Sequence, residues 1–364
     1  MLGQVHLDGN VLRRFNVLGS MVSGVLLQHS SNISALARCE PTRCAGERQS
    51  QQTKEARMIR WLKSEHNSFK VHFLPYILTL LCALAKAGSL TFSIDGSTAG
   101  RGCMVLMFSV IYKNRALPVV WHVVNAKKGH LPESMHIELL NRLAEVVPVD
   151  CQITIVGDGE YDGCDWQARI KELGWHYVLR TGVGRLIELE EGEQAKLGLF
   201  SPEPPEEFVW LEDVRFTNKR YGPVNVLVWH EKGHEAPIYL LTDYQCPYQI
   251  ASFYKQRFKI ETFFSDQKSR GFNIQRSRLS HPERLEKLLI VTCLAYILCI
   301  LGGIKCLQSK FYKTIHRMDR CDLSLFSLGW RFIEFLIDER QWRAFSLNIE
   351  PPEILYFYHA LKKV

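Results

Sequence analysis

Residues 89–124 read SLTFSIDGSTAGRGCMVLMFSVIYKNRALPVVWHVV, and this stretch is the strongest indication of the fold class. It contains three runs rich in β-branched and aromatic side chains, at 89–95, 103–112 and 117–124. A glycine-rich segment and the polar segment KNRA separate these runs. Such runs divided by turn-forming residues are typical of adjacent β-strands. The stretch therefore predicts three neighbouring strands that open one domain.

The residues that follow alternate between helical and strand-like patterns. Apolar residues recur at helical spacing in 132–147 and in 164–174, and short strand-like runs follow these segments at 151–158 and 175–181. Pro132 stands where the first of these helices would begin, a position that proline favours. The predicted order is βββαβαβ, which indicates an α/β domain.

The rest of the chain flanks or interrupts this domain. Glutamate-rich and proline-rich segments separate strand-like runs between 182 and 237, which predicts a β-rich insertion. A long helical pattern resumes at 248–270. The predicted organisation is a mostly helical N-terminal region, a first core part, the insertion, a second core part and a helical C-terminal region, at 1–88, 89–181, 182–237, 238–305 and 306–364.

The composition is typical of a folded protein. Apolar residues make up 46% and charged residues 23% of the chain, which excludes a disordered polypeptide. The net charge of +7 favours polyanionic partners. The 11 cysteines contain no CxxC pair, which argues against a disulfide framework and against a closed zinc site.

The chain carries no clear export or membrane signal. Its N-terminal segment MLGQVHLDGNVLRRFN lacks the basic start and apolar core of a secretory signal, so we expect a cytoplasmic protein without a membrane partner. The apolar run at 288–304 is 17 residues long and contains Gly302 and Gly303. It is at the short limit of a membrane span, and we expect a buried core helix instead.

Two aspartates follow predicted strands. Asp95 comes at the end of SLTFSID and Asp158 at the end of QITIVGD, and glycines stand beside both. A single aspartate in such a place is commonly a turn residue or a helix cap. The carboxyl ends of strands are also where ligand sites of α/β sheets gather, so both residues are candidates for a site.

A third acidic residue lies in the helical segment YKQRFKIETFFSDQK. Tyr254, Arg257, Glu261 and Lys268 are spaced by 3, 4 and 7 residues, so in one helix they fall within a sector of about 60°. A charged helix face is often simply solvated. Together with Asp95 and Asp158, however, this face suits phosphate chemistry, because carboxylates hold divalent metals while Arg and Lys hold phosphate oxygens.

The motifs SIDGS, VGDGEYDG and Y-x2-R-x3-E-x6-K resemble the DDE transposases of bacterial insertion sequences, in the IS4-like branch with the Tyr-Arg-Glu-Lys (YREK) signature. The resemblance covers about residues 54–305. It implies a ribonuclease-H-like core, a mixed sheet of order βββαβαβα, with a β-rich insertion before the last catalytic helix. It also implies that Asp95, Asp158 and Glu261 bind two Mg²⁺ ions, with Mn²⁺ as a substitute.

The same resemblance implies DNA contacts. Tyr254, Arg257 and Lys268 would contact phosphates near the scissile bond, in a stretch where basic residues outnumber acidic ones. In relatives that form a DNA hairpin, an aromatic residue in or near the insertion stacks on a flipped base, and Trp210 and Trp229 are the candidates here. Core packing is the alternative role of either tryptophan, and the sequence does not choose between the two residues.

The basic amphipathic pattern at 54–66 predicts a helix with Met58, Trp61 and Leu62 on its apolar side. Its basic face is either a solvated surface or a DNA-docking surface. The resemblance places recognition of the transposon ends in this N-terminal region, where a shortened recognition region is one interpretation of residues 1–53.

The sequence thus predicts a bacterial transposase, associated with the nucleoid, that cleaves transposon ends and transfers the 3′-hydroxyl to target DNA. Pairing of two ends implies a homodimer in a synaptic complex. The alternatives are a ribonuclease-H-like nuclease without strand transfer, a catalytically silent DNA-binding relative and a non-enzymatic DNA-binding regulator.

Overall fold

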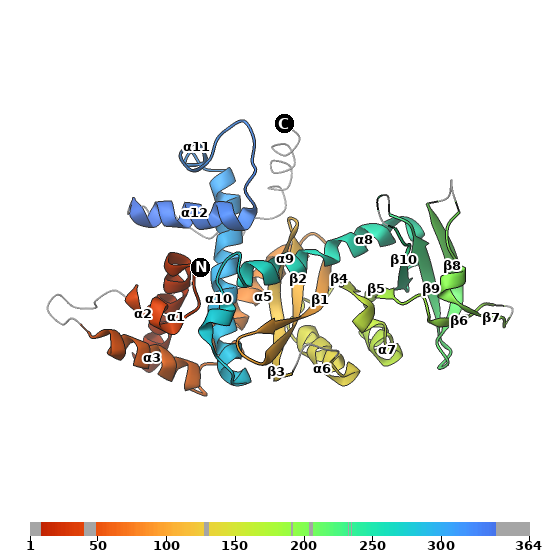
Figure 1. Cartoon of the computed structure of the whole chain (residues 1–364), viewed down its shortest axis with the longest axis horizontal. Helices are drawn as coiled ribbons and strands as arrows, with labels where there is room; N and C mark the ends of the chain where they lie inside the picture. The colour runs from red at the N-terminus through yellow and green to blue at the C-terminus, as the bar shows by residue number, and fades with distance from the viewer. Residues whose placement is uncertain are drawn as a thin grey trace.

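The structure is a computed structural model that describes residues 9–39, 49–126, 131–190, 192–203, 207–231, 233 and 235–339. A ten-stranded sheet runs through the centre of the molecule in the order β3-β2-β1-β4-β5-β10-β9-β8-β6-β7 (Figure 1). The strands are β1 (Ser89–Ala99), β2 (Cys103–Tyr112), β3 (Arg115–Asn125), β4 (Gln152–Gly157), β5 (His176–Thr181), β6 (Leu186–Glu188), β7 (Gln194–Lys196), β8 (Phe208–Phe216), β9 (Tyr221–Trp229) and β10 (Ile238–Thr242).

The first five strands form the predicted core. β1, β2 and β3 pair antiparallel as neighbours, whereas β1, β4 and β5 pair in parallel. The parallel strands are connected by crossover helices, as parallel pairing requires. These helices are α6 (Glu133–Ala144) between β3 and β4 and α7 (Cys164–Glu172) between β4 and β5. The mixed sheet and the order βββαβα followed by β5 confirm the predicted ribonuclease-H-like fold class.

The inserted strands extend the same sheet. β6 to β9 lie in the predicted insertion, and β10 joins them to the core because it pairs antiparallel with both β5 and β9. The register matches Leu240 of β10 with Arg180 of β5 and with Leu227 of β9. This pairing satisfies the backbone groups of β5, which would otherwise form an exposed edge. The insertion therefore continues the core sheet as one surface.

Helices cover the two faces of the core sheet. α8 (Ile250–Arg257) and α9 (Lys259–Gln267) run along one face, and α6 and α7 lie on the other (Figure 1). Ile250 of α8 packs with Val156 and Val178 in a small apolar cluster. The alternate strand residues enter the main core, in which Trp166 and Ile170 of α7 are fully buried. This arrangement explains why β4 and β5 are apolar on both faces.

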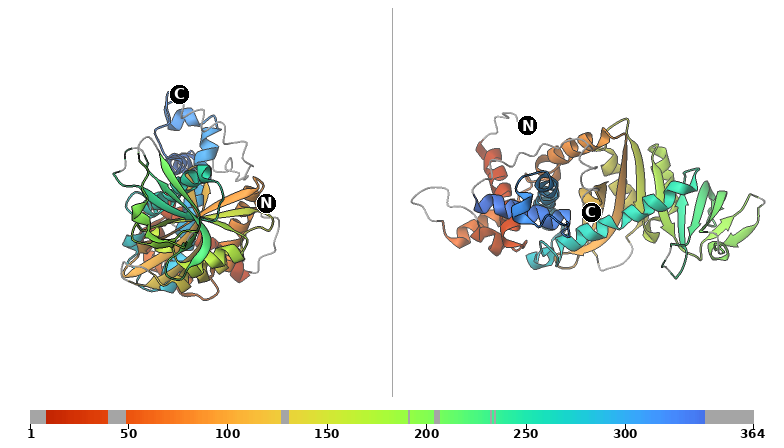
Figure 2. Two further views of the ribbon diagram at one scale, coloured as in Figure 1. Left: turned by 90° about the vertical axis from the view of Figure 1, so that its right-hand side faces the viewer. Right: turned by 90° about the horizontal axis from the view of Figure 1, so that it is seen from above.

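The remaining helices gather at the opposite end of the molecule from the insertion (Figures 1 and 2). They are α1 (Gly9–Gln28), α2 (Ile33–Arg38), α3 (Gln51–Lys63), α4 (Phe69–His72), α5 (Leu74–Ala85), α10 (Pro282–Leu307), α11 (Tyr312–Ile315) and α12 (Leu325–Asp338). In α3, Met58, Trp61 and Leu62 are buried, which confirms the predicted amphipathic helix.

α10 is the central helix of this end. Among the described residues it is the one helix long and apolar enough to cross a membrane, but 72% of its most apolar window is buried inside the protein. α12 crosses it where Gly303 meets the backbone of Leu325 and Gly329 meets the backbone of Cys299. This burial matches the core helix that the sequence predicts.

Candidate active site

The structure brings Asp95 and Asp158 together at one end of the parallel strands. β1 and β4 pair in parallel up to Ser93 and Val156, so two further residues along each chain lead to Asp95 and Asp158. The prediction that the first strand ends at Asp95 is wrong, because β1 continues to Ala99 through its pairing with β2. Asp95 therefore lies within β1, at the level where β4 has ended.

Asp158 is held by the turn that follows β4. It caps the short 3₁₀-helix η1 (Gly159–Tyr161), and its Oδ1 accepts a hydrogen bond from the backbone N–H of Glu160 at 3.0 Å. Glu160 in turn accepts a hydrogen bond from the backbone N–H of Leu131 at 2.9 Å. The turn is thereby tied to the segment that leads into α6.

A buried aspartate that the sequence interpretation missed anchors the same turn. Asp162 accepts hydrogen bonds from Nε and Nη2 of Arg185 at 2.8 and 2.6 Å, and from the hydroxyl of Thr181 at 2.7 Å. These contacts join the turn behind Asp158 to the end of β5. The second aspartate of VGDGEYDG was the available signal, but nothing in the sequence identified Arg185 as its partner.

The electrostatics of Asp95 indicate that the three carboxylates act on one another. Burial raises the pKa of Asp95 from 3.8 to about 7, and the negative charges of Asp158 and Glu261 add to the increase. The N–H of Gly96 and the charge of Arg257 lower the pKa but do not cancel this effect. Like charges close together disfavour ionisation, so a cation placed between these groups would relieve the repulsion.

This shift predicts that Asp95→Asn stabilises the metal-free protein at high pH. The folded protein binds the Asp95 proton with a pKa of about 7 and the unfolded chain with a pKa near 3.8. Stability is therefore lost as pH rises between these values, and asparagine, which stays neutral, avoids the loss. We expect a gain of about 2–4 kcal/mol at pH 8 that vanishes towards pH 4.

The measurement is urea unfolding in chelator across this pH range. Asp165→Asn is the control, because Asp165 lies at an exposed position where its carboxylate pairs with Lys219. An Asp95→Asn gain that does not depend on pH would contradict the electrostatic explanation.

Glu261 acts on Asp95 through its charge and pairs with Arg257. Nη2 of Arg257 donates a hydrogen bond to Oε1 of Glu261 at 2.8 Å. The Arg257 side chain is 7% exposed and that of Glu261 is 51% exposed, so Arg257 lies in the interior and Glu261 at the surface. Burial acts to lower the pKa of Arg257, but Tyr254 and the surrounding carboxylates raise it overall. The buried guanidinium of Arg257 is thus a counter-charge for the carboxylates of Asp95, Asp158 and Glu261.

The helix that carries these residues is interrupted. The sequence predicts one continuous helix, but α8 ends at Arg257 and α9 begins at Lys259, with a turn at Phe258 between them. The Phe258 ring is 42% exposed, and its centre lies 4.3 Å from the guanidinium carbon of Arg257. The ring therefore packs on the guanidinium of Arg257, a contact that the sequence did not reveal.

Lys268 reaches the site from beyond the helix. α9 ends at Gln267, so Lys268 is not on the predicted helical face. Its Nζ instead donates a hydrogen bond to the hydroxyl of Ser97 at 2.6 Å. Ser97 and Asp95 are two residues apart in β1 and share one face of the sheet. Lys268 therefore lies along the strand that carries Asp95.

Tyr254 is placed in the interior. Its side chain is 1% exposed and packs with Val156 and Val178 under α8. Within the described chain its hydroxyl has no hydrogen-bond partner. The guanidinium carbon of Arg257 lies 5.7 Å from the centre of its ring. Tyr254 thus supports Arg257 from beneath, and in this structure its hydroxyl is not accessible to DNA.

Trp210 and Trp229 lie outside the carboxylate group, in β8 and β9 of the insertion. Both side chains are half-buried and pack against the apolar cluster under α8. The indole N–H of Trp210 donates to Glu212 at 2.7 Å, and Nζ of Lys255 lies 4.8 Å from the ring centre of Trp229. Their proposed stacking on a flipped base stays a prediction.

The carboxylates are chemically suited to divalent metals, although each is engaged by a protein donor. Among the residues described, no three His, Cys, Asp or Glu side chains already converge as metal ligands. Asp95 accepts a hydrogen bond from the N–H of Gly96 at 2.7 Å, while Asp158 and Glu261 are held by Glu160 and Arg257. Each of these hydrogen bonds engages one oxygen of its carboxylate, so the second oxygen could serve as a metal ligand.

Comparison with known proteins assigns the chain to a family. The model of the family described as "Transposase DDE domain" matches residues 83–298, which is more than half of the chain. No curated protein matches the sequence.

Two solved structures are similar to this chain at low identity. One is a cryo-EM structure of the piggyBac transposase synaptic complex with hairpin DNA, with 12% identity, coverage of 95% of this chain and 77% of that chain, and a TM-score of 0.47. The other is a crystal structure of Ciona intestinalis Endonuclease V in complex with a 24mer DNA, with 13% identity, coverage of 53% and 93%, and a TM-score of 0.31. The assignment rests on the family match alone: the chain belongs to the transposase DDE domain family.

Proposed function

We propose that this protein cleaves DNA at transposon ends and joins the freed 3′-hydroxyl to target DNA. The observation that supports the proposal is that the charges of Asp158 and Glu261 raise the pKa of Asp95, while Arg257 pairs with Glu261 and Lys268 bonds to Ser97 in the strand of Asp95. Carboxylates are the preferred ligands of hard divalent cations, and Arg and Lys bind phosphate oxygens. Such a site is suited to phosphodiester chemistry.

Asp95, Asp158 and Glu261 would hold two Mg²⁺ ions, or Mn²⁺ in their place. When bound, such a pair activates the attacking oxygen and stabilises the departing one. Arg257 places a positive charge beside the carboxylates and would be free to bind phosphate once Glu261 turns to a metal. Lys268 would hold a phosphate oxygen beside β1. We infer that these residues are the YREK signature of the IS4-like branch, with Tyr254 as an internal support.

Both steps are substitutions at phosphorus. In cleavage, a water oxygen attacks the phosphorus at the transposon end, and the 3′-oxygen leaves and takes up a proton. In joining, this 3′-hydroxyl loses its proton, attacks a phosphorus of target DNA and releases the 3′-oxygen of the target strand. One set of side chains serves both steps because the geometry of the reacting atoms is the same.

The test uses a labelled duplex that carries the element's own ends, incubated with Mg²⁺ and a target plasmid. We expect cleaved ends that carry a 3′-hydroxyl and covalent end–target joints. Cleavage without joints would instead favour a ribonuclease-H-like nuclease. Specific binding without cleavage in Mg²⁺ or Mn²⁺ would favour a silent DNA-binding relative. Joints that come only from protein assembled on two ends would support a homodimeric synaptic complex.

We further propose that α3 contacts the transposon end. Arg60 and Lys63 are exposed on α3, on the side away from its buried Trp61. Arg60→Gln should weaken binding to end DNA and reduce the slope of log affinity against log salt by about 0.9, because one phosphate contact is lost. Fluorescence anisotropy across a salt series measures this slope. Lys171→Gln, at an exposed position on α7, is the control, and an equal effect of both changes would contradict the proposal.

This activity would take place on chromosomal DNA, so we propose a cytoplasmic, nucleoid-associated location.

A further inference from the structure

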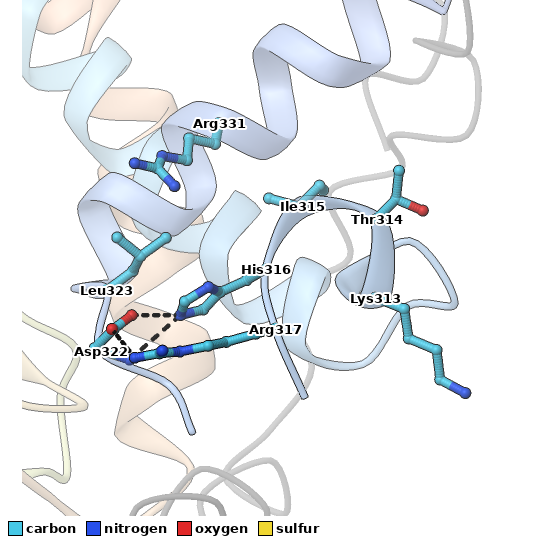
Figure 3. Close-up of a pocket in the computed structure, with 8 residues that line it drawn as sticks. All are labelled: Lys313, Thr314, Ile315, His316, Arg317, Asp322, Leu323 and Arg331. Atoms are coloured by element: carbon cyan, nitrogen blue, oxygen red, sulfur yellow. Dashed lines mark hydrogen bonds and ion pairs between the residues drawn. The ribbon is translucent and has the colours of Figure 1, made fainter. Parts of the chain in front are cut away.

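A basic hollow lies beside the C-terminal helices, and the proposed catalytic site does not use it. It has a volume of about 770 Å³ and lies between α11, α12 and the segment that joins them (Figure 3). Its charged lining consists of Lys313, Arg317 and Arg331, with His316 and one carboxylate, Asp322. Three permanent cations and a single carboxylate therefore line the hollow. The hollow is open to the surface, which suits part of a long ligand better than an enclosed small molecule.

Asp322 pairs with two of the basic residues that line the hollow. Oδ1 of Asp322 lies 2.6 Å from Nε2 of His316, and Oδ2 accepts a hydrogen bond from Nη2 of Arg317 at 2.5 Å. Figure 3 shows both side chains reaching the same carboxylate. Asp322 thus neutralises Arg317 and holds it in place. The remaining positive charge of the hollow comes from Lys313 and Arg331.

These two cations are available for a ligand. Both side chains are exposed, and in the described part of the chain neither forms an ion pair or a hydrogen bond. Arg331 projects from α12 beside Leu323, whereas Lys313 lies at the outer rim (Figure 3). A guanidinium presents donors in a fork that fits two phosphate oxygens, and an ammonium binds phosphate as a point charge. Leu323 adds apolar surface of the kind that contacts a sugar.

The helices that line the hollow, α11 and α12, lie on the side of the sheet that carries α8 and α9 (Figure 1). DNA that extends beyond the carboxylates could therefore continue over the C-terminal helices. A continuous duplex needs contacts of this kind, because phosphate contacts set its position and orientation.

We propose that this hollow binds backbone phosphates of duplex DNA outside the catalytic site, through Arg331 and Lys313. This inference rests on the proposed function, which makes DNA the substrate. An acidic protein segment would also match the charge, but the net charge of +7 and the open shape favour a polyanion of DNA type. We expect this contact to be independent of base sequence, because Arg331 and Lys313 would bind phosphates and not base edges.

The experiment measures binding of the full chain to a random-sequence duplex in NaCl from about 50 to 200 mM. Arg331→Gln and Lys313→Gln should each reduce the slope of log affinity against log salt by about 0.9, and the double variant by about 1.8. Lys171→Gln on α7 removes an equal charge from the opposite face of the sheet and should leave the slope unchanged. Thermal unfolding of each variant confirms that the fold is intact.

Cleavage of transposon-end DNA by the wild type, measured in the same preparations, separates this inference from the proposed function. If the wild type cleaves but the slopes of both hollow variants equal its own, the hollow is not a DNA contact and the catalytic proposal stands. A loss of slope for Lys171→Gln equal to that for Arg331→Gln would also overturn the inference. If the slope of log affinity against log salt is smaller for the hollow variants while the wild type does not cleave, the hollow binds DNA and the catalytic proposal fails.

Discussion

Asp158→Asn is expected to lower the rate of metal-dependent DNA cleavage by on the order of 10³-fold or more. Asparagine keeps the size of the side chain and an oxygen that can accept the hydrogen bond from the N–H of Glu160, so the turn after β4 should remain in place. It removes one of the three charges that would hold the metal pair. Glu261→Gln should have a similar effect, because it removes the charge supplied by α9.

The rate is measured in single turnover on an end duplex, alongside the affinity for the same duplex without metal. Affinity should be unchanged or higher for Asp158→Asn, because a negative charge near the phosphate is lost. Asp165→Asn, seven residues further on in α7 and exposed, is the matched control and should cleave normally. Normal cleavage by Asp158→Asn would remove this residue from the metal site.

Gly329→Ala is expected to destabilise the protein by about 3 kcal/mol or more. A Cβ atom at Gly329 would overlap the carbonyl oxygen of Cys299 and approach the N–H of Gly303, both in α10. These are backbone atoms, so no change of rotamer can relieve the overlap, and the two helices must move apart. This cost outweighs the roughly 1 kcal/mol by which alanine is the better helix former.

Urea unfolding measures the effect. Gly19→Ala is the matched control, because Gly19 also lies within a helix, yet an added Cβ there has no atom within 4 Å. We expect Gly19→Ala to be neutral or to stabilise the protein by up to about 1 kcal/mol. If Gly329→Ala unfolds at the same urea concentration as the wild type, α12 does not depend on close contact with α10.

The proximity of Asp95 and Asp158 could be predicted from the sequence, because it depends on local patterns. Runs of β-branched residues predicted the strands, and parallel strands place their carboxyl ends at one edge of a sheet. The contact between Arg257 and Glu261 was also predictable, because residues four apart on helical backbone are neighbours even across the turn at Phe258.

The environment of each side chain was not predictable in this way. Tyr254 shares its sector with Arg257, yet it is buried, because α8 lies directly on Val156 and Val178. Which face of a helix meets a sheet depends on all the elements that pack around it. Lys268 likewise reaches Ser97 because α9 ends one residue earlier, which the sequence spacing did not indicate.

Sequence patterns predicted an α/β domain, the order of its elements along the chain and the three candidate carboxylates. Each of these follows from short-range periodicity and from the chemistry of individual residues. Other features became visible in the folded structure: β10 joins the insertion to the core sheet, Asp162 and Arg185 anchor the turn behind Asp158, and burial raises the pKa of Asp95. These features depend on contacts between segments far apart in the chain, and their free energies arise from burial and proximity that appear only when the whole chain has packed.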